Sequence, residues 1–98
     1  MSLQEFTSSL QGHHPPKVNV LLQALWYEAK GDWEKAHSLA QDDPTQEGAW
    51  IHAYLHRVEG DTGNAQYWYQ RANRKMPKVA LKEEWNSMVM ELLNQINK

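Results

Sequence analysis

The sequence predicts an all-α protein in which about six helices form antiparallel hairpins, with a flanking helix at each end. Two observations indicate this fold class. Apolar residues recur at helical intervals along the chain, and no segment shows the alternation of a half-buried β-strand. The pair Gly31-Asp32 also recurs, 29 positions later, as Gly60-Asp61. A glycine that ends one helix, followed by an aspartate that caps the next, is typical of a tight turn within a helical hairpin.

Composition predicts one globular domain over residues 1–98 and argues against several function classes. Hydrophobic residues make up 41% of the chain and charged residues 22%. The net charge is −2 and there is no basic run, so we expect no nucleic-acid partner. Without cysteine the chain has no disulfide, no thiolate nucleophile and no cysteine-based zinc site.

The N-terminal residues lack both the basic start and the apolar core of a signal peptide. The longest apolar tract, Val18 to Tyr27, is too short to span a bilayer. We therefore expect a cytoplasmic protein without membrane contact.

Capping and helix-breaking residues set the predicted helix boundaries. Ser2 and Glu5 have the spacing of a capping box for the first helix. Asp43 is expected to cap the fourth helix with Pro44 at its first position, and Pro77 is expected to close the fifth. The predicted elements are a flanking helix 3–11, a hairpin 17–42 (helices 17–30 and 33–41), a hairpin 44–76 (helices 44–59 and 62–75) and a last helix 79–97.

The last helix is strongly amphipathic. Its apolar face comprises Leu81, Trp85, Met88, Val89, Leu92, Leu93 and Ile96. Met90 lies off this face, so we expect it to be exposed or at a contact. The two flanking helices would cover the ends of the hairpin pair, and any part of the apolar face left bare would suit a homodimer.

Small residues recur at matching places in the two hairpins. Ala24 and Ala36 belong to the first hairpin, and Ala53 and Ala65 belong to the second. Residues of this size let two helix backbones approach closely near the turn. A bulkier side chain at any of these positions should splay the hairpin.

The second hairpin resembles the tetratricopeptide repeat. That family's pattern, W-x2-L-G-x2-Y…A-x3-F…A…P, is matched in part by Ala53, Ala65, Tyr69, Ala72 and Pro77. The first hairpin matches through Ala24, Tyr27, Gly31-Asp32, Trp33 and Ala36, so the resemblance covers about Lys17 to Pro77. It departs from the pattern at Trp50, one place late, and at His52 and His56, where leucine and tyrosine are usual. The resemblance implies a right-handed stack of hairpins whose first helices line a concave, peptide-binding groove.

Six residues lie on the face that this resemblance assigns to the groove: Leu21, Leu25, Glu28, Trp50, Tyr54 and Arg57. Tryptophan, tyrosine and arginine are enriched at binding hot spots. We therefore interpret the chain as a non-catalytic interaction module that binds a peptide or partner helix through this aromatic face. On this interpretation Trp50→Ala should leave the fold mostly intact and abolish partner capture. The alternative is that the last helix folds over the groove and fills it.

His52 and His56 stand four residues apart on one helix face, which suits two metal ligands. The sequence has no HExxH motif, because Ala53 follows His52. Both histidines fall where the repeat places packing residues, so the sequence favours packed histidines, with no metal and no cofactor. His37 could approach them from the neighbouring hairpin. A metal- or small-ligand-binding protein centred on His52 and His56 remains the alternative function.

No residue pattern indicates catalysis. The serines have no nucleophile motif around them, and the chain has no phosphate-binding glycine loop. Asp42 and Asp43 are adjacent carboxylates, but a helix end followed by a helix cap explains both. We expect that the chain is not an enzyme.

Overall fold

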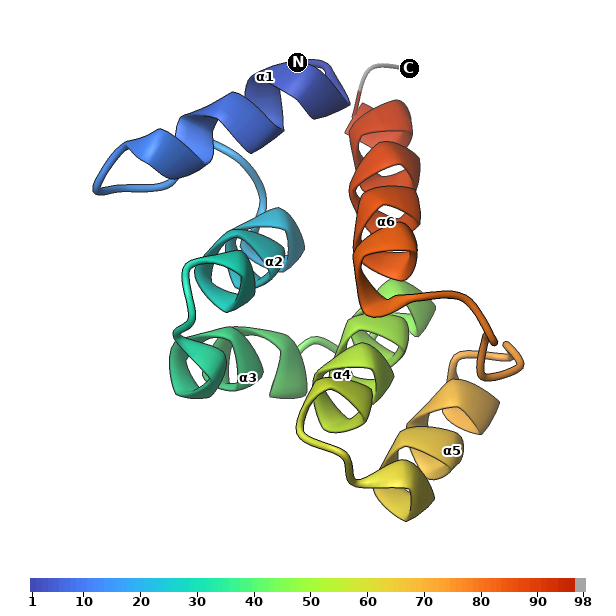
Figure 1. Cartoon of the computed structure of the whole chain (residues 1–98). Coiled ribbons are helices and arrows are strands. Elements are labelled where there is room, and N and C mark those ends of the chain that lie inside the picture. The colour runs from blue at the N-terminus through green and yellow to red at the C-terminus, as the bar shows by residue number, and fades with distance from the viewer. Residues whose placement is uncertain (97–98) are drawn as a thin grey trace.

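The computed structural model describes residues 1–96, and this part of the chain is all-helical without a strand. The elements are α1 (Leu3–Ser8), the 3-10 helix η1 (Ser9–Gln11), α2 (Val20–Ala29), α3 (Trp33–Gln41), α4 (Gln46–Val58), α5 (Thr62–Arg71) and α6 (Leu81–Ile96) (Figure 1). The predicted all-α class is confirmed. The predicted end of the last helix at Asn97 lies outside the described residues.

The two glycine–aspartate turns are built alike. Gly31 and Gly60 have φ angles of +89° and +84°, in the left-handed region that favours glycine. The Asp32 carboxylate accepts a hydrogen bond from the backbone N–H of Lys35, and Asp61 accepts the equivalent bond in the second turn. The predicted capping role of both aspartates is confirmed.

Two predicted helix starts are wrong, because a nearby polar residue caps the helix instead. Helix α2 begins at Val20 rather than near Lys17, since the Asn19 side chain accepts from a first-turn N–H at 2.9 Å. Helix α4 is capped by Thr45 rather than Asp43, and its hydroxyl accepts from a first-turn N–H at 3.0 Å. Asp43 instead accepts from the backbone N–H of Thr45 at 2.9 Å.

Helix α5 is one turn shorter than predicted. It ends at Arg71 rather than near Lys75, because Asn73 takes a left-handed conformation with φ of 57°. The chain from there to α6 has no helical structure. This loop leads to the start of α6 near α4, and α6 then runs toward α1 (Figure 1).

Helix α2 packs against α3 and helix α4 against α5, while α6 contacts α1, α2 and α4. The four hairpin alanines are fully buried: Ala24, Ala36, Ala53 and Ala65. Most of the apolar face of α6 is buried as well: Trp85, Met88, Val89, Leu92 and Leu93. Met90 is exposed, as expected, and Leu81 at the start of the helix is also exposed.

Within residues 1–96, no helix has both the length and the apolar character needed to cross a membrane.

Candidate functional site

Helix α4 carries residues of both sequence-predicted sites and directs them toward different neighbours. Trp50 and Arg57 bond to Glu84 of α6. His52 and His56 lie instead beside helix α3. The two groups therefore form separate sites on one helix.

Most of the predicted partner-binding face is buried in this structure. The residues with 0–6% exposure are Leu21, Leu25, Trp50 and Tyr54, and the half-buried ones are Glu28 and Arg57. The Trp50 indole N–H donates to a Glu84 carboxylate oxygen at 3.1 Å, so α6 packs over this end of the predicted face. Partner binding through these residues stays a prediction.

Glu84 anchors this packing, and sequence analysis did not single it out. Its side chain is 3% exposed and accepts from Arg57 at 2.7 Å and from the Tyr69 hydroxyl at 2.6 and 2.8 Å. Burial, followed by the bond to Glu84, raises the pKa of Tyr69. The available signal was position: Glu84 lies one helical turn from both Leu81 and Met88, on the edge of the apolar face.

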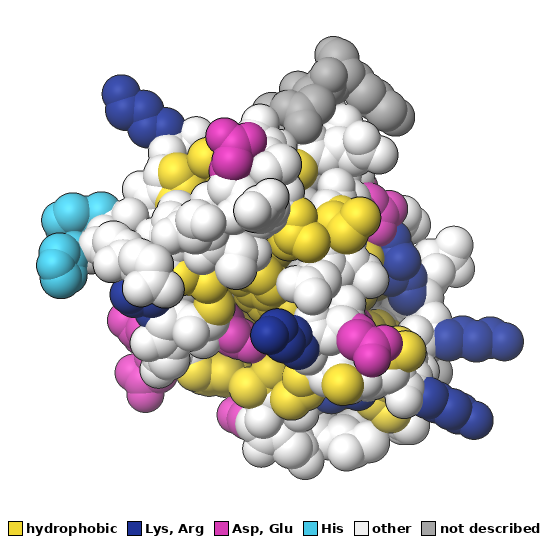
Figure 2. All heavy atoms as spheres, turned by 45° about the horizontal axis from the view of Figure 1, so that its top comes forward, with side chains coloured by type: hydrophobic (Ala, Val, Ile, Leu, Met, Phe, Trp, Pro, Cys, Tyr) yellow, Lys and Arg dark blue, Asp and Glu magenta, His cyan; other side chains and the backbone are white. Residues whose placement is uncertain are grey.

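Two residues of the predicted face, Glu28 and Tyr54, line a cleft of about 360 Å³ between α1, α2, α4 and α6. The other lining residues are Thr7, Leu10, Ala29, Lys82, Trp85 and Asn86. Hydrophobic side chains gather in the hollow of this side of the molecule (Figure 2). The Tyr54 hydroxyl donates to Glu28 at 2.7 Å. Burial raises the pKa of Glu28, and this hydrogen bond offsets part of the increase.

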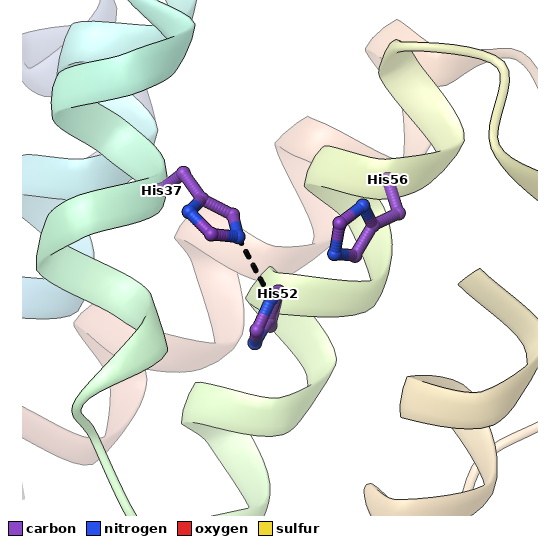
Figure 3. Close-up of side chains that lie close together, drawn as sticks. All are labelled: His37, His52 and His56. Atoms are coloured by element: carbon purple, nitrogen blue, oxygen red, sulfur yellow. Dashed lines mark hydrogen bonds between the residues drawn. The ribbon is translucent and has the colours of Figure 1, made fainter. Parts of the chain in front are cut away.

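Three histidines converge between the two hairpins. His37 of α3 meets His52 and His56 of α4, and one nitrogen of each ring lies within 4.8 Å of the others. The Nε2 atoms of His37 and His52 are 2.9 Å apart (Figure 3). His52 and His56 are buried and His37 is half-buried. The structure thus completes, with a third ring, the pair that the sequence had singled out.

Indole rings and one carboxylate hold these rings in place. The Trp33 ring stacks on His37 with centroids 4.8 Å apart, and Trp68 stacks on His52 at 4.0 Å. Glu59 lies 2.7 Å from Nδ1 of His56. Because stacking covers ring faces, the in-plane nitrogens of His37 and His52 remain free to point toward one another.

The Glu59 contact also fixes the roles of the His56 nitrogens. A carboxylate accepts, so Nδ1 of His56 carries a proton, and when this ring is uncharged its lone pair is on Nε2. Sequence analysis did not identify Glu59, although its position three residues after His56 places it on the same helix face.

The surroundings of His37 and His52 favour the uncharged form of these two imidazoles. Burial, followed by the charges of His37 and His56, lowers the pKa of His52 to about 4. Burial is also the main cause that lowers the pKa of His37, with His56 second. These two rings are therefore neutral at neutral pH and can offer lone pairs to a ligand. His13 and His14, in contrast, are exposed in the loop after η1.

No family model, curated protein or solved structure matches this chain.

Proposed function

We propose that the chain is a non-catalytic protein-interaction module that holds a peptide or partner helix in the cleft beside Glu28 and Tyr54. The cleft is the observation that carries this proposal. An apolar hollow with a few convergent polar groups and a carboxyl of perturbed pKa is the usual form of a binding site. Glu28 and Tyr54 both belong to the aromatic face that the sequence assigns to partner binding.

The proposal includes a tetratricopeptide-like, right-handed stack of the two hairpins. The matching turns at Gly31 and Gly60 and the full burial of the four hairpin alanines support it. In such a stack the first helix of each hairpin faces the concave side. Helices α2 and α4 would then present Glu28 and Tyr54 together.

Charge indicates the kind of partner. Glu28 forms no ion pair within residues 1–96, although it is half-buried among apolar groups. A lysine or arginine of the partner would supply the missing positive charge, and flanking apolar side chains would contact Leu10 and Trp85.

A capture experiment with matched variants tests this proposal. Immobilised wild-type chain, Glu28→Gln and Glu34→Gln are incubated with the same native extract, and captured proteins are identified. Glu34 is an exposed carboxylate of α3 and serves as the control for charge. We expect the wild type and Glu34→Gln to retain a common partner, which Glu28→Gln loses and a lysine-bearing apolar peptide displaces. Equal capture by Glu28→Gln, or capture that the peptide does not reduce, would exclude the cleft as the binding site.

A further inference from the structure

We infer that His37, His52 and His56 bind one divalent zinc-type metal ion, and that Glu59 holds His56 in the orientation of a ligand. This site lies between α3 and α4, and no residue of the site lines the Glu28 cleft (Figure 3). The inference therefore stands independently of partner binding.

The proton count inside the cluster is the first argument. Because Glu59 engages Nδ1 of His56, the lone pair of that ring is on Nε2. The 2.9 Å contact between Nε2 of His37 and Nε2 of His52 needs one donor and one acceptor. Three converging nitrogens therefore share a single proton in the neutral cluster. A metal ion would replace this shared proton and receive a lone pair from each of the three nitrogens. The ring that donates in the 2.9 Å contact would then carry its proton on Nδ1 instead of Nε2.

The distances between the three nitrogens also suit a shared metal ion. Zinc binds imidazole nitrogen at about 2.0–2.1 Å, so two ligands of a tetrahedral ion lie roughly 3.4 Å apart. The three nitrogens of the cluster lie within 4.8 Å of one another, and the closest pair is 2.9 Å apart. The His52 and His56 rings stack with centroids 4.8 Å apart and an interplanar angle of 27°. Because an imidazole lone pair lies in the ring plane, a shared ion requires at least one of these two side chains to rotate out of the stack.

A carboxylate beside the cluster also supports a metal site. A metal-bound histidine usually donates its other N–H to a carboxylate or carbonyl, and this contact sets the tautomer and ring orientation. Glu59 makes such a contact with His56 at 2.7 Å. A nitrogen of His56 also lies within 4.8 Å of the Asp61 carboxylate, but that carboxylate accepts two bonds from Asn64 at the start of α5. We therefore assign Glu59 and not Asp61 as the positioning residue.

The ligand set indicates the class of metal. Three imidazoles without a thiolate suit zinc, copper or nickel better than calcium or magnesium, which prefer oxygen. Within residues 1–96 the group offers three ligands, and zinc sites with three protein ligands complete their coordination with water or an exogenous group. His37 is half-buried, which gives this fourth position access to solvent.

Metal titration of the untagged full chain tests the inference. The affinity for Zn²⁺ is measured by competition with a chromophoric chelator, and Co²⁺ absorption reports the coordination geometry. The variants are His37→Gln, Glu59→Gln and the double variant His13→Gln/His14→Gln, in which two exposed loop histidines are removed as the control. Circular dichroism of each metal-free variant confirms that it is folded.

We expect one Zn²⁺ per chain and a four-coordinate Co²⁺ spectrum for the wild type and for the loop variant. His37→Gln should weaken zinc binding by at least about 100-fold and Glu59→Gln by about 10–100-fold. Should His37→Gln not fold, the imidazole nitrogen resonances of the wild type give the same answer, because zinc should shift those of His37, His52 and His56. Equal affinity of His37→Gln and the wild type, loss of binding in the loop variant, or zinc shifts confined to His13 and His14 would each overturn the inference.

Discussion

The two faces of helix α4 solve the problem of buried polar groups in opposite ways. On the face toward α6, Trp50 and Arg57 of α4 donate to the carboxylate of Glu84, which also accepts from Tyr69 of α5. The negative carboxylate thus faces a positive guanidinium and two neutral donors, so the polar groups on this face find their partners within the fold. On the face toward α3, three basic rings share the space with only one inward proton. The face toward α6 stabilises the fold, and the face toward α3 has lone pairs that could bind a ligand.

This comparison assigns different roles to residues that look alike in sequence. Trp50 and His52 stand two positions apart, and both are 6% exposed. Trp50 donates to an acid that the fold supplies, whereas His52 faces another base. Burial alone therefore does not distinguish core from site, but the chemistry of the partner group does.

The largest expected effect is on the completed face. Glu84→Ala removes the acceptor and leaves Arg57 partly buried without its counter-charge. Breaking such a pair should lower the free energy of unfolding by about 3–5 kcal/mol, measured by urea denaturation. Glu83→Ala, at the exposed neighbouring position, should change it by no more than about 0.5 kcal/mol. Similar midpoints for the two variants would show that the Glu84 bonds contribute little.

Trp50→Ala should lower the free energy of unfolding by about 3 kcal/mol, which is the lower end for a buried tryptophan. The loss is at this lower end because Arg74 stacks on the ring and can move into the space. From sequence we expected this variant to keep its fold and to lose partner capture. The 6% exposure changes that expectation, since the indole packs under α6. Thermal unfolding measures the effect. A melting temperature equal to that of the wild type would mean that the packing of Trp50 against α6 contributes little to stability.

Local chemistry explains how much of the fold could be predicted from sequence. The turns at Gly31 and Gly60 were predictable because a left-handed glycine and an aspartate cap act within a few residues. The starts of α2 and α4 were not, because Asn19 and Thr45 compete with neighbouring residues for the same role. The choice depends on how each helix meets the rest of the molecule.

The sites were harder to predict for a physical reason. The spacing of His52 and His56 identified two of the three histidines of the cluster, since residues four apart share a helix face. The approach of His37 from the neighbouring hairpin, which the sequence allowed, is confirmed. Glu84 comes from α6, and only the packing of that helix brings it to α4. The sequence placed the polar groups on their helices, but it did not show which group would become the partner of which.

The smallest expected effect concerns the pH dependence of the histidine face. The folded chain lowers the pKa of His52 from 6.5 to about 4, so between these values the unfolded chain binds more protons than the folded one. Metal-free wild type should therefore be most stable above pH 6.5 and lose stability as the pH falls toward 4. His52→Gln has no such proton to take up, and its free energy of unfolding should fall less over the same range.

Urea denaturation of the metal-free chain at intervals from pH 7 to pH 4 measures this difference. His14→Gln is the matched control, because that ring lies in solvent in the folded chain as well as in the unfolded one. It should follow the wild type at every pH. If His52→Gln follows the wild type too, the cluster does not hold His52 as a neutral base. The two faces of α4 would then differ only in how they pack. A ligand on the α3 side needs histidine rings that keep their lone pairs.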